Sequence, residues 1–142
     1  MKLKHPWLWT AAIVIAVLLF VAAYLYYRLN EALRGDYVTA GVILIVEDYV
    51  KTHDGNWPVS WEDLDGTEEA RARRQASSYW RRYTRADFTL TSEQLIRNPG
   101  LIYDAVKPVK GKYIVYPNAK LLLDDLMQAI RDARKSPTTP TR

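Results

Sequence analysis

The chain has 142 residues, 49% of them hydrophobic, with 20 basic and 16 acidic residues and a formal net charge of +4. It contains no cysteine, which excludes disulfides, thiolate metal sites and a cysteine nucleophile. Two of the basic residues, Lys2 and Lys4, stand at the extreme N-terminus, so the other 18 nearly balance the 16 acidic ones. We therefore expect no nucleic-acid partner.

Residues 7–27, WLWTAAIVIAVLLFVAAYLYY, form a segment of 21 residues without charge. As a helix it would be roughly 31 Å long, which matches the hydrocarbon core of a bilayer. Aromatic residues stand at both ends, as in the interfacial belts of membrane proteins: Trp7, Trp9, Tyr24, Tyr26 and Tyr27. The segment predicts a transmembrane helix in contact with the lipid bilayer.

A cleaved signal peptide is the alternative for the same segment. Lys2 and Lys4 would form its basic region, and the small residues before Tyr24 would allow cleavage after Ala23. The apolar run continues past that point without a helix breaker and is long for a signal peptide, which favours an uncleaved anchor. Cleavage would instead release a secreted or periplasmic binding module.

The flanking charges predict the orientation of the chain in a cell inner membrane. Lys2 and Lys4 precede the apolar segment, whereas the charges just after it nearly cancel. By the positive-inside rule, residues 1–6 are cytoplasmic and residues 28–135 form an extracytoplasmic domain. Residues 136–142, rich in Pro and Thr, are expected to be a disordered tail. The opposite orientation would give a cytoplasmic adaptor that binds acidic lipid or nucleic acid through an arginine-rich helix.

After the apolar segment, no strong helix breaker occurs before Gly55. Apolar residues recur at helical spacing in between, which predicts that the membrane helix extends into the domain. Gly35 and Gly41 oppose this by about 1 kcal/mol each, and a bend at Gly35 is an alternative. On composition alone, residues 41–46 (GVILIV) would also suit a buried strand.

The stretch HDGNWPVSWEDL, residues 53–64, predicts the end of this helix, a turn and the start of a short helix. Gly55 suits a left-handed helix stop, and Pro58 follows where a helix could not continue. Ser60 is a good N-cap, and Asp63 completes a carboxylate form of the capping box.

Apolar residues in the same stretch are expected to hold the turn in place. Val59 and Leu64 occupy the positions of a hydrophobic staple. Trp57 and Trp61 are expected to pack back on the long helix, with ligand stacking as the alternative. The predicted structural turn comprises Gly55, Trp57, Pro58, Ser60 and Trp61.

An arginine-rich helix is predicted next, capped by Thr67, with two glutamates in its first turn and aromatic residues on one face up to Tyr83. Five of its arginines are candidates for contact with an acidic partner or lipid headgroups: Arg71, Arg74, Arg81, Arg82 and Arg85. The alternative is a solvated face that the preceding acidic residues neutralise.

The remaining sequence predicts a small sheet and a final helix. Residues 87–91 alternate like a strand, and residues 101–106 and 111–117 are β-rich runs joined by a hairpin connection. Residues 92–100 fit a single helical turn and a loop. Asn118 is expected to cap an amphipathic helix whose apolar stripe is Leu122, Leu126, Ala129, Ile130 and Ala133.

These elements predict an α+β fold. An N-terminal transmembrane helix extends into a long helix, which packs on a small antiparallel sheet with a C-terminal amphipathic helix.

This order of parts, with Tyr49, Gly55, Trp57 and Pro58, resembles the pseudopilins of type II secretion and the related type IV pilins. In them a long N-terminal helix ends in a Tyr-x-x-x-x-Gly-x-Tyr-Pro type of stretch before a sheet. The resemblance implies a structural or protein-interaction subunit with a protein partner or a homo-oligomeric state. The chain departs from the family's Gly-Phe-Thr-Leu-x-Glu processing site, because KLKHPWLWTAA stands there and the first acidic residue is Glu31.

Few residues have the spacing of a catalytic or metal site. The sequence has no phosphate-binding glycine loop, nucleophile elbow or His-x-x-x-His pair, and its histidines are His5 and His53. His53 is expected to interact with the end of the long helix rather than to act as a base. We expect no enzymatic activity, no metal and no cofactor.

Overall fold

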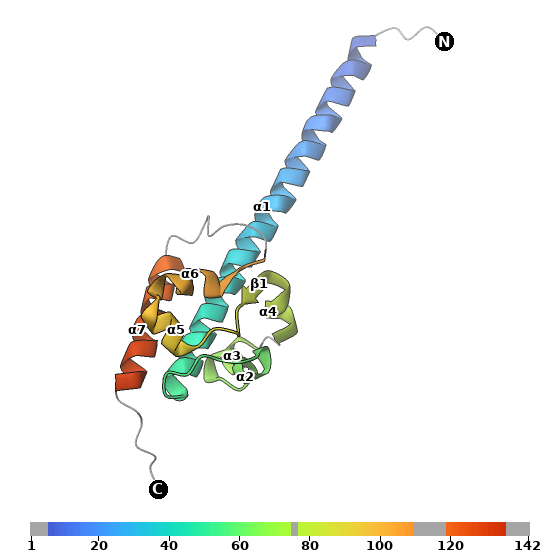
Figure 1. The fold of residues 1–142 in the computed structure, drawn as a ribbon. Coiled ribbons are helices and arrows are strands. Elements are labelled where there is room, and N and C mark those ends of the chain that lie inside the picture. Colours follow the sequence, from blue (N-terminus) through green and yellow to red (C-terminus); the bar gives the residue numbers. More distant parts are fainter. Residues whose placement is uncertain (1–5, 75–76, 110–118, 136–142) are drawn as a thin grey trace. The chain divides into compact units, whose positions relative to one another are not determined.

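The computed structural model describes residues 6–74, 77–109 and 119–135. The predictions for residues 111–117, Asn118 and the tail lie outside this part of the chain. The described elements are, in chain order, α1 (Pro6–Thr52), α2 (Trp61–Asp65), α3 (Glu68–Arg73), α4 (Ser77–Tyr83), β1 (Thr84–Ala86), α5 (Ser92–Arg97), the 3₁₀ helix η1 (Pro99–Leu101), α6 (Ile102–Ala105), β2 (Val106–Pro108) and α7 (Ala119–Lys135) (Figure 1).

The chain divides into two compact units, residues 1–33 and residues 34–142. In the first unit, the described residues belong to α1, and their apolar side chains are exposed, as at Leu18 (62%) and Phe20 (75%). Helix α1 is long and apolar enough to cross a membrane, a property that signal sequences near an N-terminus share.

The second unit is built around the C-terminal part of α1. Val42, Ile43, Ile45 and Val46 are fully buried there, so this part of the helix is covered on almost every side. The alternative of a strand over GVILIV is wrong, because α1 is helical across these residues.

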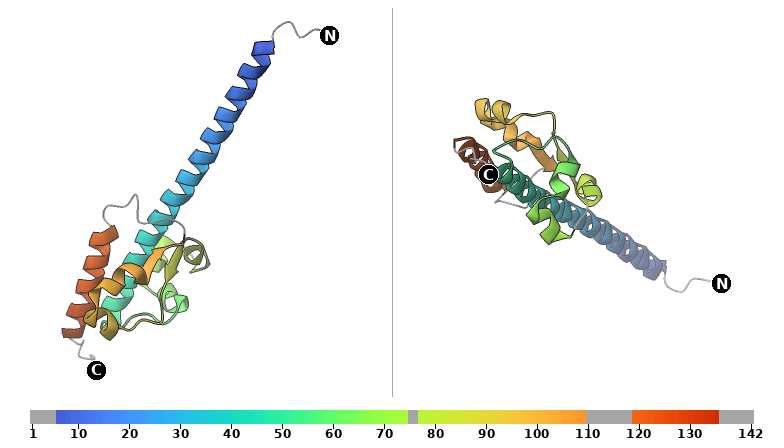
Figure 2. Two further views of the ribbon diagram at one scale, coloured as in Figure 1. Left: turned by 45° about the horizontal axis from the view of Figure 1, so that its top comes forward. Right: turned by 90° about the horizontal axis from the view of Figure 1, so that it is seen from below.

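Helix α7 packs on α1 and buries its apolar stripe, as the sequence predicts (Figures 1 and 2). Leu126 and Ile130 are fully buried, whereas Leu122 and Ala133 are half-buried. In the view of Figure 1, α2 to α4 lie to one side of α1 and α7 lies to the other. The short helices thus enclose the apolar part of α1.

Strands β1 and β2 form a two-stranded antiparallel sheet in which Arg85 lies opposite Lys107. The prediction of an α+β fold with a long N-terminal helix, a small antiparallel sheet and a C-terminal helix is confirmed. Each strand has only three residues, so helices supply most of the core.

Two predicted strands are wrong. Residues 87–91 form a turn, because the Asp87 carboxylate accepts hydrogen bonds from the Thr89 main-chain N–H (2.9 Å) and hydroxyl (2.6 Å). Residues 102–105 form helix α6, which follows a 3₁₀ turn started by Pro99. Ile102 and Ala105 are both buried. Residues three apart lie on the same face of a helix but on opposite faces of a strand, so this burial fits a helix.

The predicted arginine-rich helix is interrupted. Helix α3 ends at Arg73, and Arg74 adopts a left-handed conformation with φ of 52°. Helix α4 begins at Ser77, and β1 starts at Thr84. No glycine or proline marks this break, so the sequence pattern did not reveal it.

Gly55 follows the end of α1 in the left-handed conformation, with φ of 76°. Its N–H donates to the Val50 carbonyl (2.9 Å), as expected of a helix stop. A Cβ at this position would lie 3.0 Å from the Ile130 carbonyl oxygen and 2.8 Å from Arg134 Cγ. Both the backbone conformation and the close approach of α7 therefore require glycine.

We predict that Gly55→Ala lowers the free energy of unfolding by at least about 1 kcal/mol and Gly55→Val by more, because a side chain is disfavoured at positive φ. Thermal unfolding of the full chain in detergent, followed by tryptophan fluorescence, measures this. Gly66→Ala is the matched control, since Gly66 has φ of −80° and its added Cβ would meet no atom closer than 4.0 Å. An unchanged midpoint for Gly55→Val would contradict the helix-stop assignment.

Candidate functional site

The turn after α1 is held by hydrogen bonds at both ends. The Ser92 hydroxyl donates to the Gly55 carbonyl (2.6 Å) in a buried position. Ser60 caps α2, and the capping box with Asp63 is present. The expected staple between Val59 and Leu64 is wrong, because Val59 is 75% exposed. Its N–H instead donates to Asp63 Oδ2 (2.9 Å).

Trp57 and Trp61 differ in how they pack. Trp57 is buried, with 5% of its surface exposed, and its indole N–H donates to the Asp87 carbonyl oxygen (2.9 Å). Trp61 is half-buried and packs edge-on against Phe88, with ring centroids 5.2 Å apart, and near Trp80. Both indoles contribute to the core around the turn rather than to an open surface.

Truncating Trp57 should therefore be costly. We predict that Trp57→Ala lowers the free energy of unfolding by about 3 to 5 kcal/mol, because it leaves a large cavity and an unpaired Asp87 carbonyl. Val59→Ala, a truncation in the same turn at an exposed position, should change it by less than about 0.5 kcal/mol. Urea unfolding of the full chain in detergent measures both. A loss below about 1 kcal/mol for Trp57→Ala and Trp61→Ala would instead mark the indoles as a binding surface.

The five candidate arginines are spread over α3, its C-cap, α4 and β1, and they have different contacts. Arg71 donates to the Gly66 carbonyl (2.6 Å), and Arg81 forms an ion pair with Glu62. The Arg82 guanidinium lies 5.7 Å from the Tyr83 ring centroid. The other two occupy the exposed α3 C-cap and the exposed face of β1: Arg74 and Arg85. The structure therefore does not place the five on one helix face.

Other polar groups hold local structure. His53 Nδ1 lies 2.9 Å from the Tyr49 carbonyl oxygen, and the two rings stack 3.9 Å apart. Burial, with a smaller contribution from Asp63, raises the pKa of Tyr49 above its ordinary value. The Tyr103 hydroxyl donates to Asp124 (2.7 Å), and this hydrogen bond raises the pKa of Tyr103. Within the described part of the chain, no group of three or more His, Asp or Glu side chains is arranged to hold a metal.

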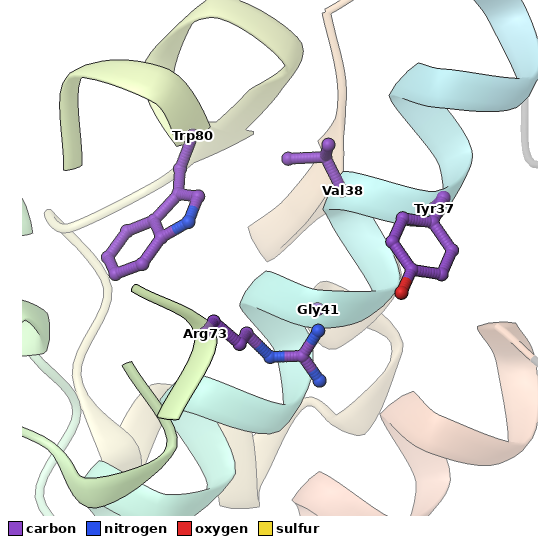
Figure 3. A pocket seen from close by; sticks show the side chains of 5 residues that line it. All are labelled: Tyr37, Val38, Gly41, Arg73 and Trp80. Atoms are coloured by element: carbon purple, nitrogen blue, oxygen red, sulfur yellow. The ribbon is translucent and has the colours of Figure 1, made fainter. Parts of the chain in front are cut away.

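A recess of about 170 Å³ lies between α1, α3 and α4 (Figure 3). Tyr37, Val38 and Gly41 line it from α1, Arg73 from α3 and Trp80 from α4. Tyr37 is 62% exposed. An average water in the liquid takes up about 30 Å³, so the recess has room for a small polar group.

The side chain of Arg73 extends from α3 to α1, and its guanidinium lies over Gly41 (Figure 3). Its Nε donates to Glu69 Oε1 (2.9 Å), and Nη2 lies 2.7 Å from the same oxygen. Nη1 would lie only 3.0 Å from a Cβ at residue 41. The absence of a side chain at Gly41 thus allows the guanidinium to lie close to the helix.

Trp80 is almost fully buried, with 1% of its surface exposed. Figure 3 shows its indole nitrogen on the edge of the ring that faces α1. Among the described residues, no side-chain nitrogen or oxygen that is buried from solvent lacks a hydrogen-bond partner. The recess is thus bordered by Trp80 from α4 and by the Arg73–Glu69 ion pair from α3.

Gly41 provides a test of this geometry. We predict that Gly41→Ala raises the free energy of unfolding by up to about 1 kcal/mol through helix propensity, because the flexible end of Arg73 can move away. Gly35→Ala is the matched control on the same helix, since nothing lies within 4 Å of its added Cβ. Thermal unfolding in detergent compares the two. A loss of stability for Gly41→Ala alone would show that Arg73 is held rigidly.

Sequence analysis did not identify this recess. In the sequence, Gly41 indicates only a position that weakens a helix, and Trp80 only part of an apolar face. The recess forms because α3 and α4 pack on a part of α1 that is far from them in the chain. No sequence pattern reports this packing.

The chain matches no protein-family model, no curated protein and no solved structure.

Proposed function

We propose that the chain is a single-pass inner-membrane protein whose domain, residues 28–135, acts as a structural or protein-interaction subunit outside the cytoplasm. The observation that carries this proposal is the exposure of the apolar side chains of α1 in residues 9–27. Exposed apolar surface of this extent is stable in lipid but not in water.

An uncleaved anchor agrees better with the described helix than a signal peptide does. Cleavage after Ala23 would leave Tyr24, Leu25 and Tyr26 at a new N-terminus, and each of these is at least 55% exposed. The same helix, α1, continues from these residues into the core of the second unit. Retention in the bilayer gives the exposed apolar residues a suitable environment.

The orientation and the role of the domain rest on further arguments. Lys2 and Lys4 favour a cytoplasmic N-terminus by the positive-inside rule. The pseudopilin-like layout, with a long helix ending at Gly55 before a small sheet, supports a subunit that associates with another protein or with itself.

Cysteine labelling tests the topology, because the chain has no native cysteine. We expect Lys120→Cys, an exposed position, to react with a membrane-impermeant maleimide on intact cells, whereas Lys4→Cys should react only after permeabilisation. The reverse pattern would place the domain in the cytoplasm. Intact mass should correspond to the uncleaved chain, and a protein that starts at Tyr24 would support the secreted module instead.

A further inference from the structure

One face of the small sheet carries two cations in opposite positions. Arg85 on β1 lies opposite Lys107 on β2, and residues paired in this way share one face of an antiparallel sheet. Arg85 is exposed, the side chain of Lys107 is 43% exposed, and its Nζ lies 3.2 Å from Asp104 Oδ1. Like charges in opposite positions repel each other, so a further anion close to both would stabilise the sheet.

The nearby chain supplies little negative charge to this face. Residues 71–85 include six arginines and no acidic residue. Within the described part of the chain, Arg82 at the end of α4 and Arg85 form no ion pair. The Asp87 carboxylate, which follows β1, accepts hydrogen bonds from Thr89. These arginines are therefore available to an anion from another molecule.

The sheet is attached to α1 near the end of the apolar segment. The Thr84 hydroxyl of β1 lies 2.9 Å from the Thr39 hydroxyl of α1. From Tyr27 to Thr39 the helix is roughly 18 Å long. A headgroup layer is about 5 to 7 Å thick, so β1 stays within roughly 12 Å of this layer, which is close to the Debye length of about 10 Å.

We propose that Arg82, Arg85 and Lys107, the basic surface, bind the phosphate groups of anionic lipid headgroups. Basic residues close to a membrane helix are attracted by the negative potential of anionic lipids. Arginine can form two parallel hydrogen bonds to a phosphate, and lysine binds it as a point charge. The proposal rests on the membrane anchor proposed above and adds a surface that holds the domain against the bilayer.

The test compares two fluorophore positions on the full chain in nanodiscs that contain a lipid with a spin-labelled headgroup. Val109→Cys places the label beside the basic surface, because the Val109 N–H donates to the Tyr83 carbonyl (2.9 Å). Val59→Cys is the matched control, an exposed valine in the turn after the C-terminal end of α1.

The nanodiscs consist of phosphatidylcholine alone or of equal parts phosphatidylcholine and phosphatidylglycerol. We expect phosphatidylglycerol to raise the quenching of the label at residue 109 at least about twofold and to leave the label at residue 59 unchanged. The increase should be lost at about 0.5 M salt, because salt screens exposed charges.

Three double substitutions, made in the chain labelled at residue 109, provide the comparison. Arg82→Gln with Arg85→Gln should abolish the increase in quenching. Arg97→Gln with Lys135→Gln removes the same charge from exposed positions at the ends of α5 and α7 and should leave the increase intact. Arg82→Lys with Arg85→Lys should retain most of it, since lysine also binds phosphate. This last variant separates loss of charge from loss of local structure.

The other outcomes would contradict the proposal. No increase with phosphatidylglycerol, or equal losses in both glutamine variants, would overturn it. Reversal of the increase by inorganic phosphate at matched ionic strength would indicate free phosphate as the ligand instead. A full chain that does not co-elute with nanodiscs would refute the anchor itself, whereas an anchored chain without a phosphatidylglycerol effect would refute headgroup binding alone. Both leaflets of a nanodisc have the same lipids, so the result does not depend on orientation.

Discussion

Covering the apolar C-terminal part of α1 is the constraint on which the second unit depends. Val42, Ile43, Ile45 and Val46 are fully buried and point in several directions around the helix axis. A sheet of two three-residue strands cannot cover such a surface. Helix α7 and the short helices do so instead, and burying each of these side chains contributes about 1.5 to 3 kcal/mol. The many short elements of the domain follow from this requirement.

The sequence correctly predicts the parts of the fold that have a long apolar periodicity or a clear helix stop signal. Helices α1 and α7 have apolar residues at helical spacing, and Gly55 ends α1 because a left-handed residue was needed there. A periodic pattern over many residues, or a glycine at a position that requires positive φ, is not overridden by a single local hydrogen bond.

The short elements were predicted less well because single local hydrogen bonds decide them. Asp87 accepts from the Thr89 N–H and turns a strand-like stretch into a turn. Asp87 also presents its carbonyl to the Trp57 indole, so this turn holds a core residue in place. Arg74 takes a left-handed conformation that its residue type does not suggest. Composition and apolar periodicity do not report such local hydrogen bonds or single-residue conformations.

The two nearly buried tryptophans show why the candidate site could not be found from sequence. Trp57 and Trp80 are 5% and 1% exposed, and a sequence pattern treats both as apolar core residues. Only the fold shows that the Trp57 N–H donates to the Asp87 carbonyl and that Trp80 lines a recess beside Arg73. The recess is therefore defined by tertiary packing and not by a sequence motif.

A buried polar contact adds to hydrophobic packing in fixing the register of α1. Thr39, fully buried on α1, lies 2.9 Å from Thr84 on β1, hydroxyl to hydroxyl. Two residues further along α1, the guanidinium of Arg73 lies over Gly41. A shift of α1 by one residue would separate the buried hydroxyls and leave each without its partner. The contact between Thr39 and Thr84 therefore specifies how α1 packs against β1, while Gly41 shapes the recess beside it.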